Sequence, residues 1–170
     1  MAEDNAPARL REPHGRGNAA PGALTLHEVT GTDAELGQVA ALLSEMDGET
    51  PLPLPRMRAL FARLRAVPDY RCYLMLGAGG EPLGTFSLLV FPVLVHAGHN
   101  EAIIEGVVVT QSARGGGVGS AMMNAAMRLA REAGADKLAL SSNGRRLQAH
   151  QFYRRLGFRE HGVSFSIDLG

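Results

Sequence analysis

The stretch VVVTQSARGGGVGSAMM, Val107 to Met123, determines the fold and holds most of the chemistry of this chain. Its three valines favour a buried strand, and an apolar helical pattern starts at about Val118. The first turn of a helix offers unpaired backbone N–H groups and the positive end of the helix dipole, and glycines allow an anion to approach the backbone. Arg114 adds charged donors beside the loop. The stretch therefore predicts a strand, a phosphate-binding loop and a helix.

Two common nucleotide-binding patterns do not match this loop. A P-loop requires Gly-x-x-x-x-Gly-Lys-Ser/Thr, and the loop contains no lysine. A dinucleotide site requires Gly-x-Gly-x-x-Gly; counted from Gly115 the sixth place is Ser120, and counted from Gly117 it is Met122. The loop also follows the fourth predicted strand rather than the first. Nucleotide binding stays an alternative that binding of ATP or NAD would support.

The segments on either side of the loop predict an α/β fold. Upstream, a short strand and two amphipathic helices precede three strands, the last at Ala102 to Thr110. Downstream, we expect a strand at Lys137 to Ser141, a helix at Arg146 to Leu156 and an alternating, half-buried strand at Val163 to Leu169. The order is β-α-α-β-β-β-α-β-α-β. This order predicts a single α/β domain with a mixed sheet, covering residues 23–170.

Charge and composition exclude several classes of protein. The 170 residues include 17 Lys and Arg against 17 Asp and Glu, so the chain lacks the net positive charge of a general nucleic-acid binder. Residues 24–110 hold ten acids and five bases, whereas residues 111–160 hold nine bases and three acids. Such asymmetry suits a polyanionic ligand bound by the second half. We expect no nucleic acid as a partner.

The ends of the chain and its apolar runs bear on location. Residues 1–22 are rich in Ala, Pro, Gly and Arg without a periodic pattern, and we expect a disordered tail there. This segment has no apolar core of the kind that a secretory signal needs. No apolar run approaches the ~20 residues of a membrane span. We therefore expect a cytoplasmic protein without a membrane partner.

The single cysteine limits the possible chemistry. Cys72 alone excludes disulfides and multi-cysteine metal sites, and we expect no bound metal. It lies in the apolar-leaning run Tyr70 to Leu76, where a small buried side chain is the usual interpretation. A covalent acyl-cysteine route is accordingly not expected.

The loop resembles the acyl-CoA signature of the GNAT superfamily of acetyl-CoA-dependent N-acetyltransferases, Arg/Gln-x-x-Gly-x-Gly/Ala. Arg114, Gly117 and Gly119 fill the signature, and Val118 stands at its aliphatic place. The segment IIEGVVV resembles the fourth strand of the family, and AHQFYRRLGF, Ala149 to Phe158, resembles its helix-to-turn segment with a tyrosine. The resemblance starts at about residue 24 and implies a mostly antiparallel sheet splayed between strands four and five.

The resemblance implies direct transfer of an acetyl group from acetyl-CoA to a primary amine of a small molecule or amino-acid-like acceptor. The valine backbone would pair with pantetheine, an N–H near Val108 or Val109 would polarise the thioester carbonyl, and the loop amides would hold the pyrophosphate. A small-molecule amine would be the partner, and a homodimer is compatible with the family. The predicted cofactor-binding residues are Val107, Val108, Val109, Arg114, Gly115, Gly116, Gly117, Val118, Gly119 and Ser120.

Glu105 and Tyr153 are the catalytic candidates. A lysine-like amine has a pKa near ~10.4 and must lose a proton before it attacks. Glu105 lies within an apolar strand, where a carboxylate is costly unless used or satisfied, and alternation places it on the face of Ile103 and Val107. The resemblance implies that Glu105 activates the amine through water and that Tyr153 protonates the leaving thiolate. The structural alternatives are a carboxylate bonded to backbone and a packed tyrosine.

Further residues and one further function stay open from the sequence. A non-catalytic acyl-CoA sensor or interaction module on the same fold is the alternative function, and the intact Glu105 and Tyr153 favour an enzyme. Asn143, Arg146 and His150 are candidates for contact with CoA. Acceptor candidates come from the helix link, the hairpin and the segment before the fourth strand; they are Asp47, Glu49, Tyr73, His96 and His99.

Overall fold

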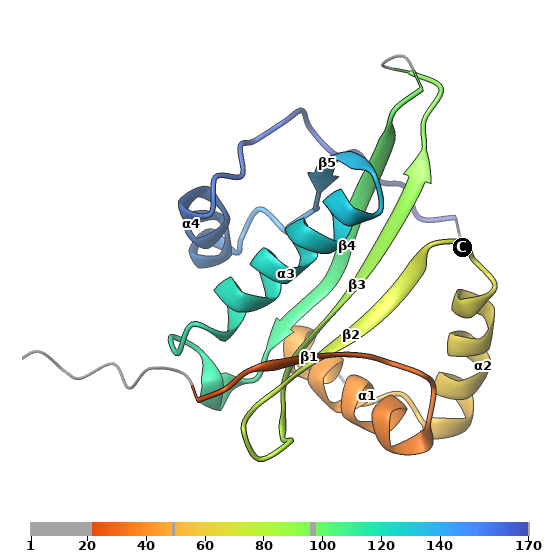
Figure 1. Ribbon diagram of the computed structural model, residues 1–170, viewed down its shortest axis with the longest axis vertical. Helices are drawn as coiled ribbons and strands as arrows, with labels where there is room; N and C mark the ends of the chain where they lie inside the picture. Colours follow the sequence, from red (N-terminus) through yellow and green to blue (C-terminus); the bar gives the residue numbers. More distant parts are fainter. Residues whose placement is uncertain (1–21, 49, 96–97, 170) are drawn as a thin grey trace, which may run out of the picture.

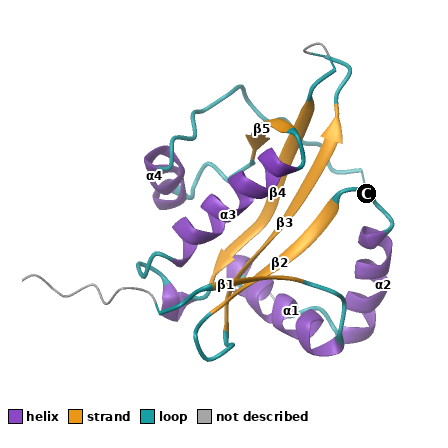
Figure 2. Ribbon diagram, in the orientation of Figure 1, coloured by secondary structure: helices purple, strands orange, loops and turns teal. Residues whose placement is uncertain are grey.

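A mixed sheet forms the centre of the structure (Figure 1, Figure 2). The computed structural model describes residues 22–48, 50–95 and 98–169, so the predicted tail falls, except for Gly22, outside the described residues. In these residues five strands have the order β1-β2-β3-β4-β5, with β5 parallel to β4 and the other pairs antiparallel. The strands are β1 (Thr25–Glu28), β2 (Tyr70–Leu76), β3 (Pro82–Pro92), β4 (Asn100–Val109) and β5 (Ala135–Ala139).

Helices cover both faces of this sheet (Figure 2). On one face α1 (Asp33–Asp47) and α2 (Leu54–Arg65) enclose an apolar cluster with Cys72 and Leu74 of β2. On the other face α3 (Val118–Glu132) packs its apolar stripe on Phe86 and Ile104, and α4 (Leu147–Arg155) adds side chains at the margin of that cluster. Burial of one stripe per helix against the sheet accounts for most of the apolar side chains, as a layered α/β domain requires.

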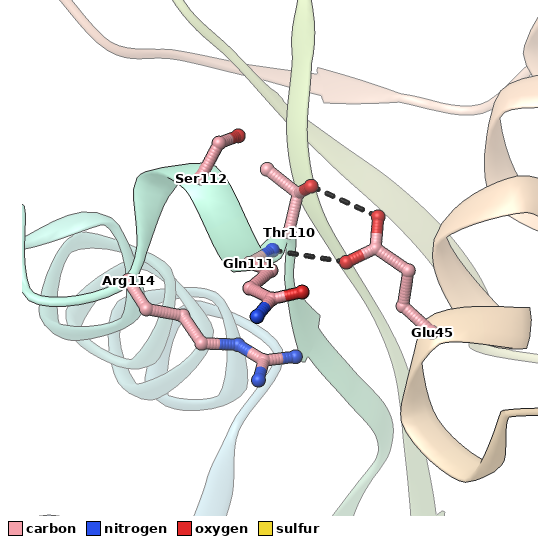
Figure 3. A pocket seen from close by; sticks show the side chains of 5 residues that line it. All are labelled: Glu45, Thr110, Gln111, Ser112 and Arg114. Atoms are coloured by element: carbon pink, nitrogen blue, oxygen red, sulfur yellow. Dashed lines mark hydrogen bonds between the residues drawn. The ribbon is translucent and has the colours of Figure 1, made fainter.

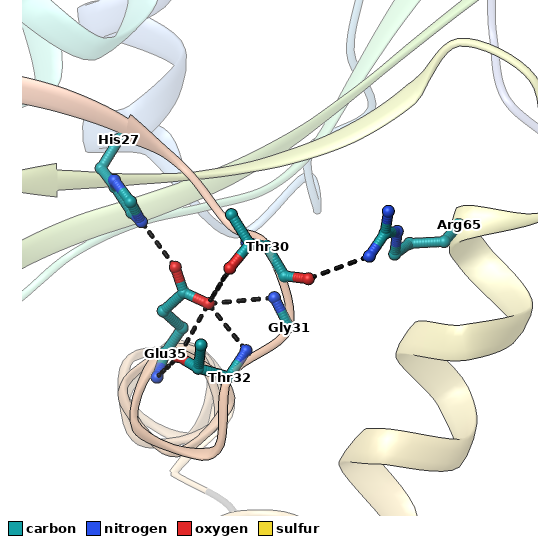
Figure 4. A network of polar contacts seen from close by, with 6 residues as sticks. All are labelled: His27, Thr30, Gly31, Thr32, Glu35 and Arg65. Atoms are coloured by element: carbon teal, nitrogen blue, oxygen red, sulfur yellow. Dashed lines mark hydrogen bonds and ion pairs between the residues drawn. The ribbon is translucent and has the colours of Figure 1, made fainter.

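The corner between β1 and α1 is held by one carboxylate (Figure 4). Thr32 caps α1, and Glu35 completes a capping box with it. The Glu35 carboxylate also accepts hydrogen bonds from His27 Nε2 at 2.6 Å and from the amide of Gly31 at 2.9 Å. Burial raises the pKa of Glu35, but the bonds from His27, Thr32 and Thr30 outweigh it and hold that pKa far below its usual range. The start of α1 is thereby fixed to the sheet.

The sheet opens at the junction of β4 and β5. β4 pairs with β5 from Asn100 to Ile103, whereas it continues to pair with β3 as far as Val109. The second half of β4 therefore has one edge without a neighbouring strand among the described residues. This is the predicted splay between the fourth and fifth strands, and together with the strand order it confirms the predicted fold class.

A β-bulge interrupts β4 where the splay begins. Ser87 pairs with Glu105 and Thr85 with Val108, so Phe86 lies opposite two residues, Gly106 and Val107. Gly106 has φ +58°, and a Cβ atom there would lie 3.2 Å from Cδ2 of Leu43 in α1. The bulge thus needs glycine both for its backbone conformation and for the close approach of α1.

The predicted last strand is the part of the expected element order that the structure does not form. Residues 163–169 form neither a helix nor a strand, and their apolar side chains are 78–93% exposed. Alternation predicts one-sided burial, but a strand also needs a neighbouring edge that completes its hydrogen bonds. Within the described residues β5 pairs with β4 alone, and no strand pairs with its other edge.

One further property concerns the helices. In the residues that the structure describes, no helix is both long and apolar enough to cross a membrane.

Candidate active site

The glycine-rich loop ends at the N-terminus of α3, as predicted. Gly115 and Gly117 have φ +80° and +85°, and Gly117 is the N-cap residue in a left-handed conformation. The first hydrogen bond of the helix runs from the amide of Ala121 to the carbonyl of Gly117 at 3.0 Å. The amides of residues 118–120 therefore precede the helical hydrogen bonds and are free to bind an anion. Gly116 differs, because its amide already donates to the carbonyl of Ala113 at 3.3 Å.

Gly119 has a packing role as well as a place in the signature. A Cβ atom at this position would lie 3.2 Å from Cζ of Phe152 in α4 and 3.6 Å from Cγ2 of Val109 in β4. Glycine thus lets the first turn of α3 approach both α4 and the end of β4. The first turn of α3, the end of β4 and α4 therefore meet at Gly119.

The open edge of β4 presents alternate residues. The amide of Thr110 donates to Leu83 of β3, and Val108 pairs with Thr85, so both residues direct their backbone groups toward β3. Alternation along an antiparallel strand then assigns the opposite edge to Val109. Its carbonyl accepts a hydrogen bond from Nε of Arg114 at 3.0 Å. The guanidinium makes no other hydrogen bond within the described residues, so its terminal amino groups can bind phosphate.

Glu105 lies on the face of the sheet that α1 and α2 cover. It pairs with Ser87, and Ser87 pairs with Cys72, whose side chain belongs to the α1–α2 cluster. Directly opposed side chains of a sheet lie on one face, which places Glu105 there. Glu105 is exposed, so the cost of burying a carboxylate does not arise at this position. Alternation predicted Glu105 and Val107 on the same face. Val107 instead packs on the α3 side, because the extra residue of the bulge reverses the alternation between them.

Tyr153 lies on the other side of the sheet. It is half-buried in α4 and packs against Phe158 with 5.9 Å between the ring centroids. Burial raises the pKa of Tyr153, and the charge of Arg146 opposes this shift. The phenol therefore stays protonated at neutral pH. It lines a cleft of about 1110 Å³ between α3, β5, α4 and the following chain. Glu105 and Tyr153 thus belong to opposite faces of the sheet, on either side of the splay.

A glutamate that the sequence does not single out bonds to the segment just before the glycine loop (Figure 3). Glu45, in the last turn of α1, accepts hydrogen bonds from the Thr110 hydroxyl and the Gln111 amide, both at 2.9 Å. These residues line an open pocket of about 630 Å³ together with Ser112 and Arg114. Glu45 is 65 residues from Thr110 in the chain, and an exposed helical glutamate has no local pattern that would indicate this contact.

The residues after β5 that are candidates for contact with CoA lie in one hydrogen-bonded group. The His150 ring donates to the carbonyl of Asn143 at 3.1 Å, and the Asn143 side chain accepts from the amide of Arg145 at 2.9 Å. Arg146 is the N-cap residue of α4. In this structure Asn143 and His150 therefore order their own loop.

The acceptor candidates are scattered. Tyr73 is buried in the α3-side cluster, away from the face of Glu105, and His99 pairs with Asp136 at 2.5 Å. Glu49, His96 and the side chain of Asp47 lie outside the described residues. Within the described part of the chain, no three or more His, Cys, Asp or Glu side chains form a group that could hold a metal ion.

A splayed mixed sheet with a glycine-rich helix N-terminus at the splay is the architecture of an N-acetyltransferase domain. The structure matches the crystal structure of a Trypanosoma brucei acetyltransferase with a TM-score of 0.73 and 26% identity, covering 86% of this chain and 100% of that one. A sequence model described as the acetyltransferase (GNAT) family matches residues 39–158. The chain belongs to this family, which confirms the predicted resemblance and an acyltransferase that uses acetyl-CoA as the acetyl donor.

Three curated relatives are named after small amine acceptors. A glucosamine 6-phosphate N-acetyltransferase of Trypanosoma brucei brucei is 36% identical over 53% of this chain and 59% of its own length. The "probable glucosamine 6-phosphate N-acetyltransferase 2" of Oryza sativa subsp. japonica is 30% identical over 85% of this chain and 87% of its own length. An aminoalkylphosphonate N-acetyltransferase of Salmonella typhimurium is 33% identical over 81% of this chain and 88% of its own length.

Proposed function

We propose that this protein transfers the acetyl group of acetyl-CoA directly to the primary amine of a small, anionic acceptor. The open edge of β4 beside the first turn of α3 supports this proposal most strongly. That edge offers backbone groups to an extended pantetheine arm, and the amides of residues 118–120 with Arg114 offer donors to a pyrophosphate. The acceptor class comes from the names of the relatives, in which an amine accompanies a phosphate or phosphonate group.

The two catalytic candidates divide the proton transfers between the faces of the sheet. Glu105 accepts a proton from the acceptor amine through water, and the free amine then attacks the thioester carbonyl. A backbone N–H on the open edge of β4 stabilises the negative charge that develops on the carbonyl oxygen. As the carbon–sulfur bond breaks, Tyr153 donates its proton to the leaving thiolate, and the nitrogen, which is positively charged after the attack, loses its second proton to water. The raised pKa of Tyr153 keeps that proton available.

Release of free thiol with a panel of amines tests the proposal. Glucosamine 6-phosphate, an aminoalkylphosphonate and the corresponding unphosphorylated amines would be compared in the presence of acetyl-CoA. We expect the phosphorylated or phosphonylated amines to react with the higher kcat/KM. Equal reaction of the unphosphorylated amines would contradict the acceptor class. Binding of CoA without thiol release from any amine would instead support the non-catalytic sensor.

Two variants test the assigned roles. Glu105→Gln and Tyr153→Phe should each lower kcat about 10²-fold or more while the Kd of CoA changes little, because general acid–base catalysis contributes about 10²–10⁴-fold. Glu101→Gln is the matched control, since Glu101 lies on the same strand and pairs with Lys137 at 2.6 Å, away from the splay. A kcat of Glu105→Gln equal to that of the control would exclude Glu105 as the base.

A further inference from the structure

Glu45 connects two parts of the molecule that have separate roles in the proposed function. It belongs to α1, the helix on the Glu105 face, and its carboxylate reaches the segment between β4 and the glycine loop. One oxygen accepts a hydrogen bond from the Thr110 hydroxyl and the other accepts one from the Gln111 amide, each at 2.9 Å (Figure 3). Gln111 begins the short 3-10 turn Gln111–Ala113, which ends at Arg114.

The position of this carboxylate is electrostatically unfavourable for an anionic ligand. Bonds from the Gln111 amide and the Thr110 hydroxyl lower the pKa of Glu45, so it is ionised at neutral pH. Among the described residues no ion pair joins Glu45 to Arg114, which lines the same pocket. A negative charge beside a phosphate-binding loop weakens phosphate binding unless its hydrogen bonds contribute more than its charge costs. The charge of Glu45 therefore predicts weaker binding of a phosphate-bearing ligand, whereas its hydrogen bonds to the loop predict tighter binding.

We propose that Glu45 is a positioning residue for the acetyl-CoA site. By holding both the side chain of Thr110 and the backbone of Gln111, it sets where the 3-10 turn starts. The 3-10 turn then determines the position of Arg114, whose Nε donates to the Val109 carbonyl. Glu45 therefore raises affinity for the cofactor through the loop that it orders, although its own charge opposes the phosphates. This inference rests on the proposed function for the loop.

Two substitutions at Glu45 separate its hydrogen bonds from its charge. Glu45→Ala removes both, whereas Glu45→Gln removes the charge and keeps an oxygen that accepts the Gln111 amide. We expect Glu45→Ala to weaken CoA binding about 5-fold or more, the effect of roughly one hydrogen bond, and Glu45→Gln to bind within about 2-fold of the parent or more tightly. Calorimetric titration with CoA measures both. The control is Glu132→Gln in α3, which should not change the Kd.

Steady-state kinetics provide a readout that a general loss of stability would not produce. In Glu45→Ala the KM for acetyl-CoA should rise while kcat at saturation stays within about 2-fold of the parent, because the reacting groups are untouched. Thr110→Val removes the hydroxyl bond alone and should give a smaller rise. It also serves as the second variant if Glu45→Ala does not fold. If Glu45→Ala instead lowered kcat about 5-fold and left the KM for acetyl-CoA unchanged, the positioning role would be overturned.

The outcomes distinguish this inference from the proposed function. If Glu45→Ala and Glu45→Gln both bind CoA as tightly as the parent, Glu45 does not affect the site; if both bind more tightly, Glu45 acts only through its charge. The inference is wrong in either case. If the parent protein itself does not bind CoA, the proposed function fails first, whatever the variants do. Weaker binding by Glu45→Ala with rescue by Glu45→Gln supports the inference.

Discussion

Replacement of Glu35 should be among the most destabilising single changes outside the apolar core. The Glu35 side chain is 12% exposed and joins β1, the turn after it and the first turn of α1 (Figure 4). Oε2 has donors at Thr30, Gly31 and Thr32 between 2.8 and 3.2 Å, and Oε1 has His27 at 2.6 Å. A carboxylate offers about four acceptor positions in all, so these bonds do not all contribute fully.

The magnitude follows from the donors that Glu35→Ala would leave. Loss of the capping interaction costs about 1 kcal/mol, and backbone amides left without an acceptor cost roughly 1–3 kcal/mol more. We therefore expect a loss of about 2–4 kcal/mol in the free energy of unfolding. For a domain of this size that corresponds to a fall in Tm of about 5–15 °C. Glu35→Gln keeps one oxygen and should lose about half as much.

The pH dependence has a definite sign. The pKa of Glu35 is lowered in the folded protein relative to about 4.3 in an unfolded chain, so unfolding takes up a proton at low pH. The stabilisation is complete above about pH 5 and is lost as the pH falls toward the folded pKa. Glutamine has no such proton to take up. The difference in stability between the parent and Glu35→Gln should therefore shrink as the pH falls from about 5 to about 3.

Urea denaturation followed by circular dichroism at several pH values measures these differences. Glu28→Gln is a suitable control, because Glu28 lies beside the same corner and makes an exposed ion pair with Arg71 at 3.4 Å. Its effect should stay within about 0.5 kcal/mol at all pH values. A loss of less than about 1 kcal/mol in Glu35→Ala, or a difference between parent and Glu35→Gln that is independent of pH, would refute the reasoning.

Two further changes test the loop and the end of the chain. Gly117→Ala places a Cβ atom on a residue with φ +85°, which should cost about 1–2 kcal/mol of stability and weaken CoA binding. Denaturation and calorimetry measure the two effects, and an unchanged affinity for CoA would show that the loop conformation does not matter for binding. Phe165→Ser changes a side chain that is 93% exposed, so Tm should move by no more than about 2 °C; a larger fall would reveal that the segment packs against a surface in solution.

The local patterns of the sequence were sufficient for most of the fold. Periods of 2 and 3.6 residues located the strands and helices that carry the site, because each element buries one face against its neighbour. The glycine run and the apolar pattern after it predicted a loop followed by a helix from about Val118, and α3 begins at Val118. The same patterns predicted a last strand at residues 163–169. Alternation alone could not supply the neighbouring edge that such a strand needs.

The order of the elements as far as α4 and the place of the glycine loop before α3 were thus determined by the sequence alone, since turn chemistry and periodicity act between near neighbours in the chain. The orientation of the site was decided by tertiary structure. The bulge at Gly106 puts Glu105 and Val107 on opposite faces of the sheet, and the approach of α1 brings Glu45 to the amide of Gln111. Both depend on strand register and helix packing between segments far apart in the chain. Such long-range contacts have no local period by which a sequence could indicate them.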